Sequence, residues 1–245
     1  MTLSQRLFLV ALATSPGPLA QQPAARPNGL YATLETSMGN ITFELFEKET
    51  PVTVKNFTDL ALGRVAYNDP RNGLPSRIPF FNGLTFHRVI PGFMIQGGDP
   101  LGNGTGGTRN IPDEFKPELN FDRPGRVGMA NSGPNTGSCQ FFITEAEQPH
   151  LNQLHTVFGQ VVEGQEVVAK ITSVATQNDR PIEAVTIEKV RVVRVGPGPN
   201  PNAPPPAPAL PKLVAPAKPV APMKPVAAAA KPVAAPAAKK IPTKK

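Results

Sequence analysis

Residues 86–99 read FHRVIPGFMIQGGD, an apolar stretch that contains one cation, Arg88, and one neutral amide, Gln96. Alternation of residue types predicts two short strands joined by a turn at the Pro-Gly pair. In that arrangement Arg88, Met94 and Gln96 line one concave surface beside Phe93. An arginine amid apolar side chains is costly to bury without a partner. It therefore either extends to the rim of the sheet, which is the commoner case, or has a function on that surface.

Two long stretches of this chain resemble the signatures of one protein family. Residues 86–99 resemble the central signature of the cyclophilins, a family of peptidyl-prolyl cis-trans isomerases. Residues 129–143, MANSGPNTGSCQFFI, resemble the other signature of that family and follow in the same order. Two matches of this length are far more specific than a short motif. The resemblance extends over residues 31–195.

The remaining pattern predicts a mainly β fold. Many short strand patterns separated by turn residues, with two helical stripes among them, favour an antiparallel sheet. The resemblance implies that this sheet closes into an eight-stranded antiparallel β-barrel capped by two α-helices. Strands are expected in residues 30–46 (a hairpin), 84–89, 93–96, 127–130, 140–144, 157–161 and 182–195, and helices in residues 51–62 and 163–174. Residues 67–80 are rich in turn signals and are expected to form a polar surface loop.

The family's reaction is rotation about an X-Pro peptide bond, whose barrier is about 18–20 kcal/mol. The twisted amide loses its resonance, and the prolyl nitrogen regains a lone pair. A fixed cation with N–H donors binds that state better than the planar one, so no nucleophile, metal or cofactor is needed. Arg88 suits this role because its guanidinium stays protonated and presents a rigid fork of donors.

The other site residues follow from the resemblance alone. It implies Arg88, Phe93 and Gln96 as the catalytic residues, with Gln96 helping to place Arg88. Without it, Phe142 and Leu151 would be ordinary core residues and Gln96 a core amide. The resemblance also implies eight substrate-binding residues. They are Met94, Phe142, Leu151 and His155 around the proline ring, Asn131 and Gln140 along the backbone of the substrate, and His150 and Gly104 at the groove edge.

One position departs from the best-known cyclophilins. They carry a tryptophan at the groove edge, where this chain has His150. This chain contains no tryptophan at all. The isomerase residues are intact, but a large aromatic donor is missing. We therefore expect weak binding of the drug cyclosporin.

Other chemistries find little support in the sequence. Three histidines and one cysteine without ligand spacing predict no metal site. Gly102, Gly104 and Gly107 formally match a dinucleotide-binding pattern, but no helix follows and no βαβ unit surrounds them. Cys139 has no base placed beside it by the sequence, so a buried structural thiol is the expected role. We predict no cofactor.

Composition divides the chain into four segments. Residues 1–20 have the order of a secretory signal peptide, residues 21–29 read as a linker, residues 30–196 as the isomerase domain, and residues 197–245 as a disordered tail. Export is the favoured localisation, and a cytoplasmic protein with an N-terminal extension is the alternative. The segment before the tail has 17 basic and 18 acidic residues, a net charge of −1.

The tail is rich in proline, alanine and lysine, with eight lysines and no acidic or aromatic residue. It is either a solvating spacer or a non-specific contact for a polyanion. Proline-containing polypeptides are the expected partners, and a monomer is expected. An active isomerase is favoured over a non-catalytic proline-binding scaffold or chaperone localised by its tail, because the arginine is intact.

Overall fold

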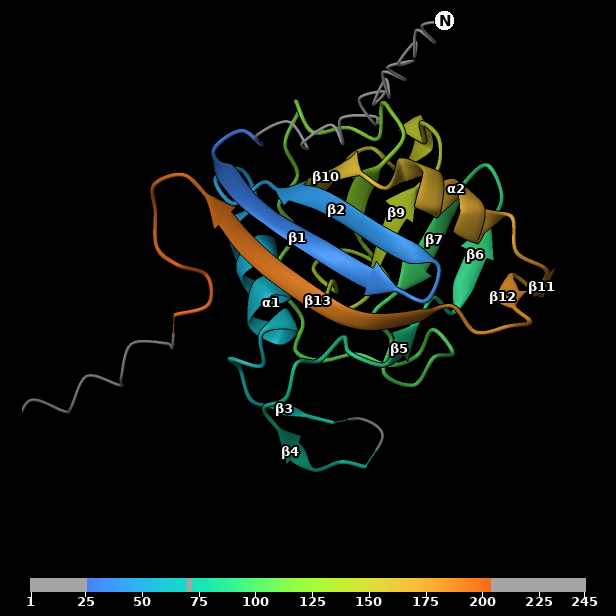
Figure 1. Cartoon of the computed structure of the whole chain (residues 1–245), viewed down its shortest axis with the longest axis horizontal. Coiled ribbons are helices and arrows are strands. Elements are labelled where there is room, and N and C mark those ends of the chain that lie inside the picture. Colours follow the sequence, from blue (N-terminus) through green and yellow to red (C-terminus); the bar gives the residue numbers. More distant parts are fainter. Residues whose placement is uncertain (1–25, 70–71, 204–245) are drawn as a thin grey trace, which may run out of the picture. The chain divides into compact units, whose positions relative to one another are not determined.

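The computed structural model describes residues 26–69 and 72–203 (Figure 1). The predicted signal peptide, residues 1–20, and the tail from residue 204 onward lie outside the described residues.

The described chain forms a strongly curled, nine-stranded antiparallel sheet with two α-helices (Figure 1). The strand order is β5-β13-β1-β2-β10-β8-β9-β7-β6. Its strands are β1 (Gly29–Thr36), β2 (Gly39–Leu45), β5 (Leu84–Thr85), β6 (Arg88–Ile90), β7 (Met94–Gly97), β8 (Arg126–Met129), β9 (Phe141–Thr144), β10 (Val157–Glu163) and β13 (Thr186–Val195).

The strand expected over residues 84–89 is in fact two strands. β5 pairs with β13, whereas β6 pairs with β7. Phe86 and His87 cross between them, so β5 and β6 lie at the two ends of the strand order although they are neighbours in sequence. The local alternation continues through this crossing, which is why residues 84–89 read as one strand. The sheet has nine strands, whereas the resemblance implied eight.

Two hydrophobic clusters lie on opposite faces of the β6–β7–β9 part of the sheet. The main core contains Phe57, which stacks on Phe81 at 5.0 Å between ring centroids. On β9, Phe141 belongs to this core, while the next residue, Phe142, belongs to a second, smaller cluster. Successive side chains of a strand point to opposite faces, so β9 contributes to both.

Helix α1 (Pro51–Ala61) packs against β13, and helix α2 (Gln165–Thr172) packs against β2 and β7. Thr50 stands at the expected N-cap position of α1, but its hydroxyl donates to the Phe46 carbonyl instead of capping the helix. Glu114, distant in sequence, accepts the first-turn N–H groups of Val52 and Thr53 at 3.1 and 2.8 Å. A carboxylate at a helix N-terminus is favourable because free N–H groups and the helix dipole meet there.

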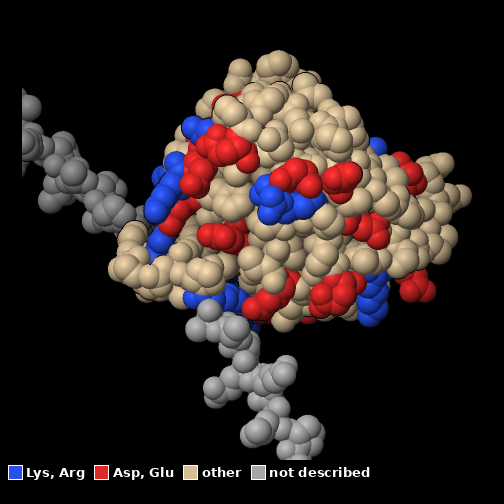
Figure 2. All heavy atoms as spheres, turned by 90° about the horizontal axis from the view of Figure 1, so that it is seen from above, with Lys and Arg blue, Asp and Glu red and all other residues tan. Residues whose placement is uncertain are grey.

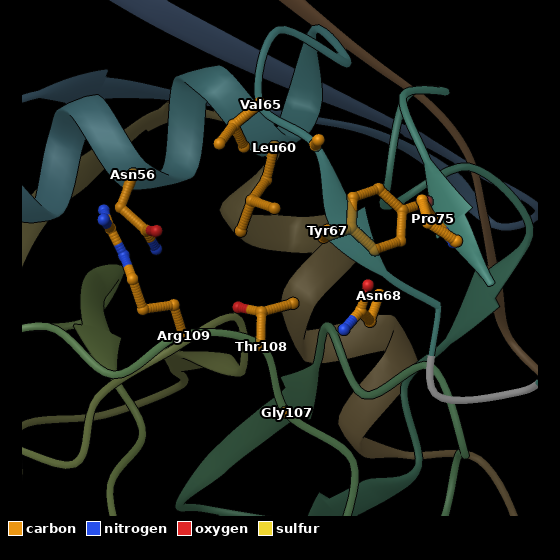
Figure 3. A pocket seen from close by; sticks show the side chains of 10 residues that line it. Asn56, Leu60, Val65, Tyr67, Asn68, Pro75, Gly107, Thr108 and Arg109 are labelled. Atoms are coloured by element: carbon orange, nitrogen blue, oxygen red, sulfur yellow. The ribbon is translucent and has the colours of Figure 1, made fainter. Parts of the chain in front are cut away.

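Residues 67–80 are less loop-like than expected. They contain a two-stranded hairpin, β3 (Tyr67–Asn68) and β4 (Pro75–Ser76). Tyr67 and Phe80 are buried and meet edge to face at 4.7 Å. A pocket of about 480 Å³ lies between this hairpin, α1 and residues 107–109 (Figure 3), and none of the predicted site residues lines it.

Acidic and basic side chains are interspersed on the face of the protein seen in Figure 2. The first residues after the domain, 197–203, are described and lie against it. Arg64 donates to the carbonyls of Pro201 and Ala203, and Asn202 Nδ2 donates to the Val192 carbonyl at 3.1 Å.

Candidate active site

Three of the predicted residues form a row across three strands. Arg88 on β6 is directly opposite Gln96 on β7, and Gln96 is directly opposite Phe142 on β9. Directly opposite residues of antiparallel strands project from the same face. The register therefore places a cation, an amide and an aromatic ring side by side on the face away from the main core.

An apolar floor lies beside this row. The second hydrophobic cluster contains Met94, Phe142 and Leu151, with Phe93 packed against it. Phe121 stacks on Phe142 at 5.4 Å between centroids with 22° between the planes, and is fully buried. Sequence reasoning did not select Phe121, because an isolated phenylalanine carries no sign of what it supports.

Two histidines border this floor. His150 lies in the 3₁₀ turn Pro149–Leu151, is exposed, and places its ring 5.7 Å from that of Phe93. His155 stands edge-on to Phe142 at 5.3 Å, and its Nδ1 lies 3.1 Å from the Met129 carbonyl. Burial lowers the pKa of His155, although the Met129 carbonyl opposes this. A carbonyl can only accept, so Nδ1 carries the proton and Nε2 is an acceptor in the neutral ring.

A chain of amide hydrogen bonds connects Gln96 to the glycine-rich loop. Gln96 Nε2 donates to Gln140 Oε1 at 2.9 Å. Gln140 Nε2 in turn donates to the carbonyls of Gly104, at 3.1 Å, and Gly106, at 2.8 Å. This side-chain bond of Gln96 goes to Gln140, so the role of Gln96 in placing Arg88 stays a prediction.

Asp99, the last residue of the opening stretch, organises that loop. Its buried carboxylate accepts backbone N–H groups of Leu101, Asn103 and Gly104 at 2.8, 2.9 and 2.5 Å. Burial alone would raise the pKa of Asp99, but the backbone donors outweigh it and hold the pKa below its usual value. A Cβ at Gly106 would collide with Asp99 Oδ1, so only glycine fits there.

Sequence reasoning did not select Asp99, although an aspartate before a glycine-rich segment is typical of loops built on such bonds.

Arg88 itself is accessible. Its side chain is 45% exposed, and its Nε lies 3.7 Å from Asp179 Oδ2. A polar cleft of about 570 Å³ lies alongside Arg88 and Gln96, between residues 102–104 and residues 177–180. Nothing in the sequence pairs Asp179 with Arg88, because the two are far apart along the chain.

The structure thus brings the predicted residues into one connected region. Asn131 joins it through Nδ2, which donates to the Leu154 carbonyl at 2.8 Å, in the turn between Leu151 and His155. Cys139 is buried, as expected, and burial raises the pKa of its thiol to about 11, which disfavours the reactive thiolate.

Among the described residues no group of three or more His, Cys, Asp or Glu side chains is arranged to hold a metal ion. The same part of the chain contains no helix that is both long and apolar enough to cross a membrane.

Comparison with known proteins identifies the family. The model of the family "Cyclophilin type peptidyl-prolyl cis-trans isomerase/CLD" matches residues 31–192. Peptidyl-prolyl cis-trans isomerase A of Mycobacterium tuberculosis is 51% identical over 166 residues, which cover 66% of this chain and 91% of that protein. Peptidyl-prolyl cis-trans isomerase B of Streptomyces anulatus is 48% identical over 168 residues, which cover 66% of this chain and 96% of that protein.

Solved structures agree with this. The crystal structure of a cyclophilin-type isomerase of Cryptosporidium parvum is similar with a TM-score of 0.59 and 32% identity, covering 68% of this chain and 98% of that one. A second structure of that protein, in the presence of the dipeptide Ala-Pro, has a TM-score of 0.58 and 33% identity and covers 65% and 96%. This chain belongs to the cyclophilin-type peptidyl-prolyl cis-trans isomerase family.

Proposed function

We propose that this protein accelerates cis-trans exchange of X-Pro bonds in polypeptides and that Arg88 stabilises the twisted amide. The observation that carries the proposal is the row of Arg88, Gln96 and Phe142 beside the apolar cluster of Met94 and Leu151. A proline ring seated on this cluster brings its amide nitrogen within reach of the guanidinium. The alternative, a binding module without activity, is less favoured because the cation is in place.

The chemistry needs only differential binding. In the planar amide the nitrogen lone pair is delocalised, so it is a poor acceptor for the Arg88 N–H groups. In the twisted state the lone pair is localised and accepts well, which lowers the barrier. His155, neutral when its pKa is lowered by burial, forms an uncharged wall of the proline slot beside Phe142.

The substrate is a proline-containing polypeptide bound through its backbone as well as its proline. Asn131 and Gln140 border the row, where an extended chain would pass. Their side-chain amides already donate to the Leu154 carbonyl and to the Gly104 and Gly106 carbonyls, so they hold the edges of the path in place. Gly104 has φ +89 and open space where a Cβ would be, so a peptide can approach the loop backbone closely. The solved relative studied in the presence of Ala-Pro supports this substrate class.

The test uses the full chain and a short X-Pro peptide in a buffer with a chelator and no nucleotide. Two-dimensional exchange NMR should show cis and trans signals exchanging far faster than the uncatalysed tens to hundreds of seconds. Peptide binding without accelerated exchange would instead favour the scaffold alternative.

We also propose that the curled sheet closes into a barrel, as the resemblance implies. Its two outer strands, β5 and β6, are separated by only Phe86 and His87. The backbone N–H of Phe86 donates to the Val185 carbonyl at 3.0 Å, which ties this crossing to the segment before β13.

His150 is expected to weaken cyclosporin binding relative to cyclophilins with tryptophan at the groove edge. Its exposed ring packs on Phe93 but offers less apolar area than an indole. His150→Trp should tighten cyclosporin binding by about tenfold, consistent with roughly 1.4 kcal/mol of added contact, as measured by titration calorimetry. Strong binding by the unaltered protein, or no gain on substitution, would contradict the correspondence at this position.

The tail is proposed as a non-specific polyanion contact. All eight of its lysines follow residue 205, whereas the chain before the tail has a net charge of −1. Deleting residues 206–245 should abolish retention on heparin at low salt and leave turnover of a short peptide unchanged, since such binding depends on charge. This deletion keeps residues 197–203, which contact the domain. A tailless protein that still binds heparin would place the basic surface on the domain.

A further inference from the structure

Arg88 faces the acidic side chain of Asp179, to which the family resemblance gives no role. Asp179 lies in the turn between the short strands β11 (Thr176–Gln177) and β12 (Arg180–Pro181), beside β6 (Figure 1). Its Oδ2 is 3.7 Å from Arg88 Nε, and the carboxylate side chain is 53% exposed. It is the one ion-pair partner of Arg88 among the described residues.

The position of Asp179 is set by its backbone. Asn178 and Asp179 have φ values of 51° and 62°, the left-handed conformation of a tight hairpin turn. The Asp179 carbonyl accepts the backbone N–H of Val89 at 2.7 Å. Val89 is the residue after Arg88, so the turn is fastened to the strand that carries the arginine. This backbone hydrogen bond holds the Asp179 carboxylate beside Arg88 and does not involve the carboxylate itself.

This ion pair contributes little to stability. Both side chains are about half exposed, and exposed pairs gain little because water screens them and two side chains lose freedom. The left-handed turn accounts for the residue type, since aspartate tolerates that conformation, and the approach to Arg88 Nε is a separate feature of its side chain.

We propose that Asp179 is a positioning residue for Arg88, an inference that rests on the proposed function. At 3.7 Å from Nε, beyond hydrogen-bond distance, the carboxylate attracts one edge of the guanidinium electrostatically and biases its orientation. The terminal Nη groups are then left for the substrate amide. A guanidinium has five donors in a rigid plane, so holding one edge orients the others. The orientation is fixed before the substrate binds, which reduces the entropy lost on reaching the transition state.

Asp179→Asn tests the proposal cleanly. Asparagine tolerates the left-handed conformation and keeps the carbonyl that accepts from Val89, so only the charge is lost. We expect kcat/KM for a short X-Pro peptide to fall about fivefold, mainly in kcat, with an unchanged melting temperature. The matched control is Glu35→Gln, which removes a carboxylate from another exposed ion pair, with Arg191, and should leave the rate unchanged.

A double-mutant cycle separates positioning from a structural role. In the Arg88→Ala background, Asp179→Asn should cause no further loss, because there is no guanidinium left to orient. A similar fivefold loss in both backgrounds, or an unchanged or higher kcat/KM in the single variant, would overturn the proposal. If Arg88→Ala alone kept the full rate, the proposed role of Arg88 in catalysis would be wrong. Any loss of kcat/KM in Asp179→Asn would then not act through Arg88.

Discussion

Replacing Arg88 by alanine is expected to lower kcat/KM for a short X-Pro peptide by about 10²–10³, the usual loss for one donor to a transition state. The guanidinium is the charged donor in the row of Arg88, Gln96 and Phe142, whereas the Gln96 amide already donates to Gln140. Arg88 is therefore the proposed donor to the localised lone pair of the prolyl nitrogen. The side chain is 45% exposed, so its removal leaves no buried cavity and the fold should survive.

The measurement is two-dimensional exchange NMR at equal protein concentration, with far-ultraviolet circular dichroism to check the fold. Arg191→Ala is the matched control, because Arg191 is another exposed arginine in an ion pair, here with Glu35. This variant should isomerise the peptide at the rate of the unaltered protein. Arg88→Lys should give an intermediate rate, because lysine keeps the charge but not the planar fork of donors. Equal rates for Arg88→Ala and the unaltered protein would remove Arg88 from the mechanism.

The second large effect concerns stability. Asp99→Asn is expected to lower the free energy of unfolding by about 3 kcal/mol, since hydrogen bonds to a buried charged group contribute roughly 1.5–3 kcal/mol and unsatisfied donors add to the loss. The amide that replaces one carboxylate oxygen would face backbone N–H groups of the 101–104 loop. Because the Gly104 and Gly106 carbonyls hold Gln140, turnover should fall as well.

Urea unfolding at pH 7 measures this change. The control is Asp113→Asn, whose carboxylate accepts a single backbone N–H, from Asn135 at 2.7 Å, and which should cost under about 1 kcal/mol. A loss no larger for Asp99→Asn than for Asp113→Asn would show that the loop does not depend on Asp99.

The pH dependence of stability gives an independent check. The folded protein holds the pKa of Asp99 below its unfolded value of about 4. Its stabilisation is therefore fully present above about pH 4 and is lost as the pH falls through the lower folded pKa. Asp99→Asn, which cannot titrate, should show a smaller decrease in unfolding free energy below pH 4 than the unaltered protein. Parallel curves would contradict this.

Some of the site follows directly from local sequence. Alternation along residues 86–99 predicts that Met94 and Gln96 share a face, and the register agrees, because side-chain direction in a strand depends only on position along it. Partners from distant segments follow no such rule. No local sequence pattern predicts that Glu114 contacts the first turn of α1 or that Asp179 lies beside Arg88.

The sequence by itself determined the family and the mainly antiparallel sheet, since these are carried by contiguous motifs and by a period of two. The residues assigned to the proline site follow from the family resemblance and stay a prediction. Only the tertiary structure decided that residues 84–90 divide between the two ends of the strand order, that Phe141 and Phe142 serve two different clusters, and that Arg88 has an acidic neighbour. These depend on which strands pair and on how the sheet curls, and pairing is settled by the summed burial of distant segments, which local spacing does not encode.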